Sequence, residues 1–550
     1  MWCCVTITGA WKITNKHALF DPVRYRGEMI KQDQSAQVAL LSDPAVFAAE
    51  FGDTGETVAR VTTHASELFI GTTRVLKLKR AVEYPFMDYA TVARRHTYCL
   101  AEVAVNRRTA PHMYLGVRAI VRGLDGDLRL GPLNHDPDGD EVIDWVVEMV
   151  RFDQDTLFDR LADKGRLDRP VMEHLADKIA TFHAASEARQ DGGGRTGIAM
   201  TIESNAKAFA ENGPGFLDME RVAMLTERSL EAVNDSLVLL ERRRLNGCVR
   251  HCHGDMHLRN IFLQGTEPVL FDAIEFNDAF SIIDVLYDLA FLLMDLDHRG
   301  LRSLANVTMN RYMDITGSAW GLSVLPLFLS VRAAVRAFVA CAAANSVDDA
   351  DFKARQGQQG AAYLDRALGY LEVPAPRLIA VGGLSGSGKS RLGRELARHI
   401  GAAPGARVVR SDVVRKRIAG LHPLDPLGPD GYSAEMTERT YRAVYEEAQA
   451  VLASGHSVIA DCVFSKPSER QAIEDVAREM EVPFDGFWLT APPEILQQRV
   501  QERENNPSDA DVRVVKMQMD YDLGAIDWHA IDASKSRAET DAQALKKLDL

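Results

Sequence analysis

A glycine-rich loop followed by lysine and serine is the strongest chemical signal in the sequence. Residues Gly383–Ser390 read GLSGSGKS, between the apolar segment LIAV and the helix-like segment SRLGRELARHI. Glycines let the backbone turn tightly and aim N–H groups at a phosphate, and the helix start adds partial positive charge. We therefore expect Lys389 to reach the β- and γ-phosphates of ATP and the Ser390 hydroxyl to ligate Mg²⁺. The predicted nucleotide-binding residues here are Gly383, Leu384, Ser385, Gly386, Ser387, Gly388, Lys389 and Ser390, and a Gly-Ser linker is the alternative.

An acidic residue and three cations follow the next apolar segment, ARVVR. Asp412 could orient or deprotonate an acceptor hydroxyl, which makes it a candidate catalytic residue beside Lys389. Arg415, Lys416 and Arg417 stand next on a predicted helix and could hold an anionic substrate. A helix cap at Asp412 and a solvated basic face remain the alternative.

Three more residues complete the predicted phosphoryl-transfer site. Asp461 ends the apolar segment SVIAD and is the expected carboxylate partner for Mg²⁺. Arg499 and Arg503, one helical turn apart, suit a lid that closes over the phosphate, with surface salt bridges as the alternative. From about residue 376 onward the chain resembles the P-loop small-molecule kinases of the gluconate-kinase and zeta-toxin type. The resemblance rests on GLSGSGKS, RSDVVRKR, VIADCVF and LTAPPEILQQRVQERENNPSDAD.

A second chemical signal is the histidine-rich stretch HCHGDMHLRN, from His251 to Asn260. A zinc site would use His251, Cys252, His253 and His257. Structural zinc sites draw their ligands from two separated pairs, and no second Cys/His pair lies nearby. A catalytic loop fits the stretch better, because Asp255 and Asn260 have the spacing of the kinase pattern H-R-D-x-x-x-x-N.

Further residues extend this second site. Asp272 follows the apolar segment PVLF, so Asp255 could accept a hydroxyl proton while Asn260 and Asp272 hold Mg²⁺. Upstream, Lys77 or Lys79 on one strand face could reach the ATP phosphates and pair with Glu102. Residues 37–345 resemble the aminoglycoside phosphotransferase family of kinase-like enzymes, on the evidence of HGDMHLRN, LFDAIEFND and DVLYDLAFLLMDL.

That resemblance implies a base role for Asp255 and metal roles for Asn260 and Asp272. It also implies that His253 braces the loop, while His251 and His257 are expected to be ordinary loop residues. Four acidic residues nearby are not among the predicted catalytic and metal-binding residues of this site. Glu275 and Asp278 either assist the metal or acceptor or serve as caps, and Asp284 and Asp288 are expected to be structural anchors.

Length and composition set the class of protein. A chain of 550 residues with 46% hydrophobic and 26% charged residues should fold into several soluble domains. The net charge of -14 argues against nucleic-acid binding. Seven scattered cysteines favour a reducing, cytoplasmic location, and we expect neither a signal peptide nor a membrane span. PLFLSVRAAVRAFVACAAA is instead expected to be a soluble amphipathic helix, because two arginines interrupt it.

The pattern of segments predicts an α+β, protein-kinase-like bilobal domain followed by an α/β P-loop NTPase domain with a parallel sheet. An antiparallel sheet with one helix near YCLAEVAVNRR is expected over residues 37–130, and mainly helix is expected over 141–345. The predicted domains are an N-terminal extension (1–36), the kinase-like domain (37–345), a linker with one short helix (346–375) and the P-loop domain (376–550).

The function predicted from these patterns is ATP- and Mg²⁺-dependent phosphoryl transfer at two sites to hydroxyl groups of small molecules. A kinase domain regulated by a non-catalytic P-loop domain is one alternative. A nucleic-acid end kinase is another, which the net charge disfavours. The patterns leave the acceptors and the oligomeric state open, and the resemblance does not make aminoglycosides the expected substrate.

Overall fold

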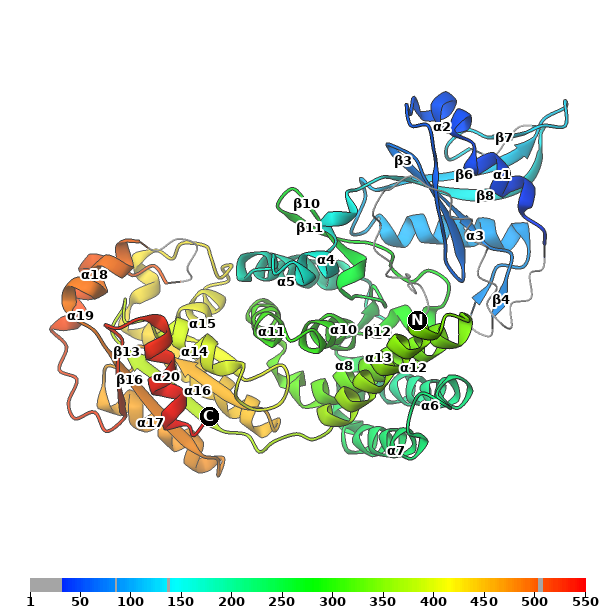
Figure 1. The fold of residues 1–550 in the computed structure, drawn as a ribbon. Coiled ribbons are helices and arrows are strands. Elements are labelled where there is room, and N and C mark those ends of the chain that lie inside the picture. Colours follow the sequence, from blue (N-terminus) through cyan, green and yellow to red (C-terminus); the bar gives the residue numbers. More distant parts are fainter. Residues whose placement is uncertain (1–31, 85–86, 136–138, 503–507) are drawn as a thin grey trace. The chain divides into compact units, whose positions relative to one another are not determined.

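The computed structural model describes residues 32–84, 87–135, 139–502 and 508–550, and Figure 1 labels its elements. Two compact units divide the chain. The first contains the described part of Met1–Leu167 with Phe182–Leu292 and Val331–Ala367, and the second contains Asp168–Thr181, Leu293–Ser330 and Leu368–Leu550. This division differs from the predicted domain boundaries, because residues 168–181 and 293–330 group with the C-terminal residues. The predicted extension 1–36 lies almost entirely outside the described residues.

The first unit contains an antiparallel sheet of six strands in the order β1-β2-β3-β8-β6-β7. The strands are β1 (Ala59–Thr62), β2 (Ser66–Ile70), β3 (Arg74–Lys79), β6 (Tyr114–Arg122), β7 (Leu128–Leu130) and β8 (Glu141–Val150). The predicted sheet is confirmed, but β8 falls in the stretch that we expected to be mainly helical. Its run of buried apolar residues lacks the alternation that marks a strand, and pairing with both β3 and β6 places it inside the sheet.

Helices cover both faces of this sheet (Figure 1). They are α3 (Val92–Asn106) on one face and α1 (Ser35–Ser42) with α2 (Pro44–Phe51) on the other. Cys99 and Val103 of α3 pack with Val147, whereas Leu41 and Phe47 pack with residues that point to the opposite side. The helix expected near YCLAEVAVNRR is therefore confirmed.

The remaining helices of the first unit follow the sheet. They are α4 (Phe158–Asp163), α6 (Gly194–Asn212), α7 (Met219–Asp235), α8 (Leu237–Leu245) and α9 (Asp278–Ser281). Some helices have residues in both units: α5 (Arg169–Ala185), α10 (Val285–His298), α12 (Leu325–Ser346) and α13 (Ala350–Tyr370). The prediction of a short helix in the linker is wrong, because α13 has 21 residues.

The apolar helix α12 is buried along most of its length. Among the described residues, 319–346 are long and apolar enough to cross a membrane, and 94% of the most apolar window is buried inside the fold. Arg332 is fully buried, where it donates to the carbonyl oxygens of Tyr287 at 3.0 Å and Gly254 at 3.1 Å. The expectation of an amphipathic helix is wrong at this position, because the charge is bonded inside the protein instead of facing solvent.

The second unit is built on a parallel sheet of five strands in the order β14-β15-β13-β16-β17. The strands are β13 (Leu378–Gly383), β14 (Arg407–Arg410), β15 (Val458–Asp461), β16 (Phe484–Thr490) and β17 (His529–Asp532); the helices are α11 (Arg302–Thr316), α14 (Lys389–Ala397), α15 (Ser411–Ile418), α16 (Ala434–Ala453), α17 (Pro467–Glu479), α18 (Pro493–Gln501), α19 (Val512–Met519) and α20 (Arg537–Lys547). Strands β13, β14, β15 and β16 fall in the segments LIAV, ARVVR, SVIAD and FDGFWL, which the sequence pattern predicts as strands, whereas β17 and α16 were not anticipated. Since parallel strands end at one edge, the loops after β13, β14 and β15 meet there.

Helix α11 is bonded to the edge strand β14, which explains its place in the second unit. The side-chain oxygen of Asn310 accepts from the Val408 amide at 2.7 Å, and the Asn306 side-chain amide donates to the Ala406 carbonyl at 3.0 Å. The buried guanidinium of Arg407 lies 2.6 Å from the Asp314 carboxylate. These bonds use backbone groups that an edge strand would otherwise leave unpaired.

Candidate active sites

The glycine-rich loop of the second unit has the backbone conformation that its sequence predicts. Gly386 has φ +86°, and a Cβ at this position would lie 2.4 Å from the carbonyl oxygen of Leu496. A Cβ at Gly383 would lie 2.7 Å from the carbonyl oxygen of Leu489. Only glycine fits at these two points, so the loop holds its compact turn between β13 and α14.

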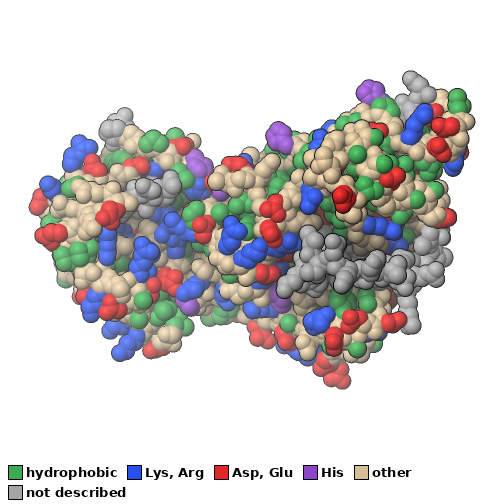
Figure 2. Space-filling view, turned by 45° about the horizontal axis from the view of Figure 1, so that its top comes forward, with side chains coloured by type: hydrophobic (Ala, Val, Ile, Leu, Met, Phe, Trp, Pro, Cys, Tyr) green, Lys and Arg blue, Asp and Glu red, His purple; other side chains and the backbone are tan. Residues whose placement is uncertain are grey.

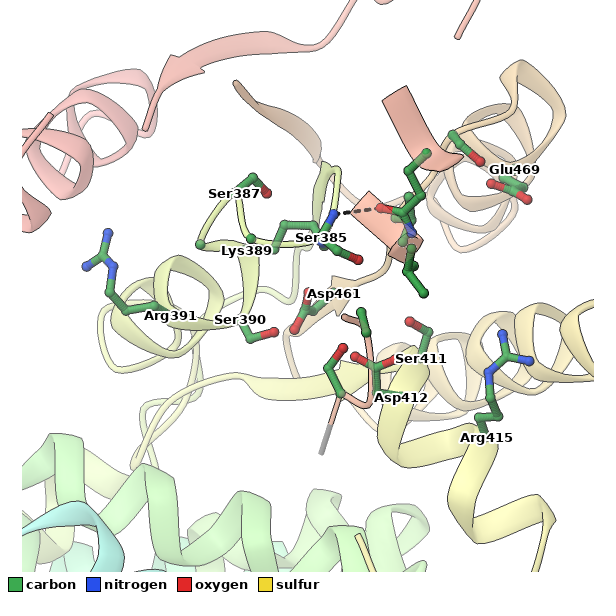
Figure 3. Close-up of a pocket in the computed structure, with 18 of the residues that line it drawn as sticks. Ser385, Ser387, Lys389, Ser390, Arg391, Ser411, Asp412, Arg415, Asp461 and Glu469 are labelled. Atoms are coloured by element: carbon green, nitrogen blue, oxygen red, sulfur yellow. Dashed lines mark hydrogen bonds between the residues drawn. The ribbon is translucent and has the colours of Figure 1, made fainter. Parts of the chain in front are cut away.

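Two polar groups of this loop bond to protein acceptors, and a third has no partner in the described part of the chain. Lys389 Nζ donates to the Leu384 carbonyl at 3.1 Å, and the Ser385 amide donates to Gln518 at 2.8 Å, as the dashed line in Figure 3 marks. The Ser387 hydroxyl is buried and has no hydrogen-bond partner among the described residues. Burying a hydroxyl without a partner costs about 1–3 kcal/mol, so a phosphate oxygen at this point would remove a penalty.

A cavity of about 1780 Å³ brings the predicted residues of the second unit together. Its lining includes the loop from Ser385 to Arg391, with Asp412, Asp461 and Arg499. Figure 3 shows Ser390, Asp461 and Asp412 facing the same space, whereas Arg391 points away from it and pairs with Asp541 at 2.7 Å. Arg503 lies outside the described residues, so the predicted pair of lid arginines is described at one member only.

The surroundings of Asp412 decide between the two interpretations of its segment. The start of α15 has no side-chain cap hydrogen bond, so the capping alternative finds no support. Lys416 is buried and pairs with Asp509 at 3.0 Å, and Arg417 pairs with Glu447. Arg415 lines the cavity and donates to Gly431 and Thr437. The basic run is therefore not a solvated face, and Arg415 alone of the three lines the cavity.

The oxygen donors in this cavity fit a magnesium ion. Ser390 supplies a hydroxyl at the start of α14, and Asp461 supplies a carboxylate at the end of β15. Mg²⁺ is a hard cation that takes oxygen ligands from one or two protein groups and from substrate phosphates. Asp461 lies 3.3 Å from Arg410, which balances its charge in the structure.

The histidine-rich stretch of the first unit forms a braced loop between β9 (Val249–His251) and β10 (Ile261–Gln264). The Asp288 carboxylate accepts from the amides of His253 at 3.0 Å and Gly254 at 2.9 Å. His253 Nε2 lies 2.8 Å from the Phe271 carbonyl, which agrees with the predicted bracing role. Asp288 thus holds the loop as an anchor.

The zinc set considered from the sequence is not assembled among the described residues. The potential metal ligands that lie close together there are His183, Cys252 and Asp288. That group contains Cys252 but none of the three histidines of the stretch. Asp288 already accepts from His253 and Gly254 and lies 3.2 Å from His183 Nε2, so its oxygens have structural partners.

Asp255 and Asn260 lie side by side in this loop. The Asn260 side-chain amide donates to the Asp255 carboxylate and to its carbonyl oxygen, each at 2.9 Å. His257 is buried with Nε2 3.5 Å from the carboxylate, so the expectation that it is an ordinary loop residue is wrong. Burial alone would raise the pKa of Asp255, but the charge and hydrogen bond of His257 lower it below the ordinary value.

Lys77, Lys79 and Glu102 form a buried ion-pair network. Glu102 accepts from Lys77 and from Lys79, each at 2.7 Å, one oxygen to each lysine. Lys77 also lies 3.0 Å from Asp272, and Lys79 lies 2.5 Å from Glu275. Burial lowers the pKa of Lys77, but the carboxylates of Asp272 and Glu102 raise it well above the ordinary value. Both lysines are therefore charged, and Lys77 is the one beside the predicted metal ligand.

Asp272 has an uncommon backbone conformation beside Asn260. Its φ is +59°, a region that non-glycine residues rarely adopt and that clusters at functional sites. The amide of the preceding residue, Phe271, donates to the Asn260 carbonyl at 3.0 Å, and the Asp272 amide donates to the Tyr114 hydroxyl at 3.2 Å. A carboxylate and a side-chain amide oxygen are donors that Mg²⁺ accepts, so this pair also fits the ion.

Several residues of both sites carried no signal in the sequence. Tyr89 bonds Glu275 at 2.8 Å, Tyr114 bonds Asp272, and Gln518 bonds the phosphate loop from 133 positions away. Each comes from an element that local patterns cannot assign to the site. The anchoring role expected for Asp284 agrees with its buried, two-bond pairing with Arg243, at 2.7 Å for each bond.

Comparison with known proteins bears on each part of the chain. Residues 378–521 match the family model of the AAA domain. The C-terminal part of the chain is a P-loop domain. In the first unit a lysine lies on a strand, a glutamate lies on a helix, and the Asp255 loop precedes Asp272, which is the order that the sequence motifs predict for a kinase-like site. An adenylyl-sulfate kinase of Myxococcus xanthus is 30% identical over 115 residues, which cover 21% of this chain and 57% of that kinase.

Other relatives extend over more of the chain. An uncharacterized protein of Mycobacterium tuberculosis is 27% identical over 493 residues, covering 88% of this chain and 93% of that protein. Among solved structures, a gluconokinase from Sinorhizobium meliloti is 24% identical, with a TM-score of 0.23. The match covers 32% of this chain and 92% of the gluconokinase chain. A choline/ethanolamine kinase family protein from Mesorhizobium loti is 15% identical, with a TM-score of 0.37. That match covers 62% of this chain and 96% of the other chain. Scores of this size carry no weight for the fold, which the strand orders define.

Proposed function

We propose that this chain is a phosphotransferase with two sites, each moving the γ-phosphoryl group of ATP to a hydroxyl group of a small molecule. The P-loop cavity of the second unit carries the proposal. It contains an orphaned hydroxyl in the phosphate loop, two oxygen donors for Mg²⁺ and a carboxylate, Asp412, facing the same space. Binding Mg²⁺ at Ser390 and Asp461 would neutralise charge on the β- and γ-phosphates.

The residues of this cavity take separate roles in the proposal. The loop amides and Lys389 hold the phosphates, Asp412 orients the acceptor hydroxyl, and Arg499 approaches the phosphate from the lid. Phosphoryl transfer needs little covalent chemistry from a protein, so positioning and charge neutralisation account for most of the rate.

The kinase-like unit would work by the same principles with different residues. Lys77, held by Glu102, contacts the ATP phosphates, and Asn260 with Asp272 holds Mg²⁺. Asp255 then accepts or orients the acceptor hydroxyl. The support is their arrangement: Asp255 is 2.9 Å from Asn260, and Lys77 is 3.0 Å from Asp272.

Two substitutions in the full chain test the proposal. ADP release is measured with sugars, sugar alcohols, nucleosides and aminoglycosides as acceptors. We expect Asp255→Ala to abolish turnover with one set of acceptors and Lys389→Ala with another. If one substitution removes all turnover and the other none, only one site is catalytic, which is the behaviour of a kinase regulated by a nucleotide-binding domain.

We further propose that the protein acts in the cytoplasm on small molecules and not on nucleic acid. The net charge of -14 supports this, and on the face drawn in Figure 2 lysine and arginine side chains are interspersed with acidic ones. Cys99, Cys248, Cys252, Cys341 and Cys462 are free thiols, and Cys3 and Cys4 lie outside the described residues. Oligonucleotide binding that weakens steeply with salt would contradict the proposal.

A further inference from the structure

Two helices that precede the P-loop by many residues belong to the P-loop unit. Helix α11 is bonded to β14 through Asn306 and Asn310. The first part of α5 is joined to α11, because Arg311 donates to both oxygens of Asp177, at 2.6 and 2.9 Å. The P-loop unit therefore has a wall made of residues 168–181 and 293–330.

This wall reaches the cavity that holds the phosphate loop. Arg169 at the start of α5 lines the cavity, together with Ser303, Leu304 and Val307 from α11. Arg394 of α14, one helical turn beyond Ser390, lines the same cavity. Arginines from two distant parts of the sequence, Arg169 and Arg394, thus line one cavity.

Two guanidinium groups, those of Arg169 and Arg394, line this cavity. The charge of Arg410 also acts on Arg394, while Glu173 and Asp461 act in the opposite direction. Burial, followed by the charges of Arg410 and Arg169, lowers the pKa of Arg394 to about 9. The Arg394 side chain forms no hydrogen bond or ion pair with any described residue.

The other two arginines are only partly balanced. Arg169 lies 3.9 Å from Glu173, the limit of an ion pair, and its side chain is 42% exposed. Arg410 contacts Asp461 at 3.3 Å through Nε, while its Nη2 is buried without a partner in the described chain. A donor of a charged group is costly when it is buried without a partner, so an anion placed beside Arg394 and Arg169 would be held firmly.

We propose that Arg169 and Arg394 form a subsite in this cavity for an anionic group, such as a phosphate, sulfate or carboxylate, apart from the phosphates held by the P-loop. The anionic group belongs either to the acceptor or to a free anion that binds beside it. The proposal extends the phosphotransferase function given above for this cavity. It makes α5 a part of substrate recognition, although α5 lies in the sequence region of the kinase-like fold.

Phosphate binding to the full chain tests the subsite. Inorganic phosphate is titrated calorimetrically into protein saturated with Mg²⁺ and a nonhydrolysable ATP analogue, so that the P-loop is filled. Wild type is expected to bind phosphate, and Arg169→Ala to bind it roughly tenfold or more weakly. Arg169 is partly exposed, so this variant should fold. Arg394→Gln, a second variant inside the cavity, should weaken binding similarly.

Arg478→Ala is the matched control, because its side chain is 69% exposed on α17 and outside the cavity. It should bind phosphate as wild type does. If phosphate competes with the acceptor and raises its KM, the subsite binds an anionic group of the acceptor. If phosphate leaves the acceptor KM unchanged, the subsite binds a free anion. Equal binding by wild type and Arg169→Ala, or no binding to wild type, overturns the subsite. Loss of turnover with every acceptor, while phosphate binding stays dependent on Arg169, contradicts the phosphotransferase function alone.

Discussion

At the scale of single residues, Lys77 and Lys79 show how similar side chains take different tasks. Both lysines bond Glu102, but their second partners differ: Asp272 for Lys77 and Glu275 for Lys79. Lys77 is 13% exposed and lies beside the predicted metal ligand, whereas Lys79 is 1% exposed. The sequence left open which lysine contacts phosphate, and this geometry favours Lys77.

Substituting the two lysines should therefore give opposite results. Lys77→Met is expected to lower kcat/KM of the kinase-like site about a hundredfold, because a cation facing the phosphates is lost. Its effect on stability should be smaller, since Glu102 keeps Lys79. Lys79→Met should cost about 3–5 kcal/mol of unfolding free energy, because it leaves the buried Glu275 carboxylate without its cation. Urea unfolding and ATP turnover measure both effects, and a stable but inactive Lys79→Met would reverse the assignment.

His257 should set the acid limit of the activity that depends on Asp255. The pKa of Asp255 lies below its ordinary value, so the carboxylate stays charged as the pH falls through the usual range of aspartate. Removing His257 leaves burial, which raises the pKa. His257→Leu should therefore shift the acid limb of the pH profile of kcat/KM upward by about one unit. His251→Leu is the control, and an unmoved limb in His257→Leu would contradict the role.

At the scale of elements, the parallel sheet explains why the predicted site residues of the second unit lie close together. The loop, Asp412 and Asp461 each follow a strand, and parallel strands bring such positions to one edge. Sequence reading failed where the partner element is distant. Nothing in the segment around Asn306 or Asn310 indicates that their amides bond β14, because that contact joins residues about a hundred positions apart.

The bonds between α11 and β14 should contribute measurably to stability. Asn310→Ala leaves the buried Val408 amide without its acceptor, which should cost about 1–3 kcal/mol of unfolding free energy. Asn246→Ala, at an exposed asparagine after α8, should change it by less than about 0.5 kcal/mol. Denaturant unfolding of the full chain measures both. Equal stability of the two variants would show that α11 contributes little.

At the scale of the whole molecule, the order of motifs in the sequence does not predict which residues belong to which compact unit. The motif residues of both candidate sites could be proposed from the sequence, because each motif is local. The membership of residues 168–181 and 293–330 in the P-loop unit could not, and neither could the place of Arg169 in its cavity. These depend on side-chain bonds such as Arg311 to Asp177, for which the sequence has no periodic signal.

A chain shortened to residues 376–550 should consequently be unstable. It would lack α11, so β14 would become an unprotected edge, and the buried Arg407 would lose Asp314. We expect a lower melting temperature and aggregation relative to the full chain, measured by scanning calorimetry and light scattering. A monomeric fragment that melts cooperatively at the temperature of the full chain would contradict the structural role of α11.

The existence of two nucleotide sites in one chain is tested most directly by binding stoichiometry. A nonhydrolysable ATP analogue with Mg²⁺ is titrated into the wild-type chain, Lys389→Ala and Asp272→Asn. The account predicts two analogue molecules per wild-type chain and one per chain for each variant, with the remaining affinity unchanged. One molecule per wild-type chain, lost completely in Lys389→Ala and retained in Asp272→Asn, would contradict it.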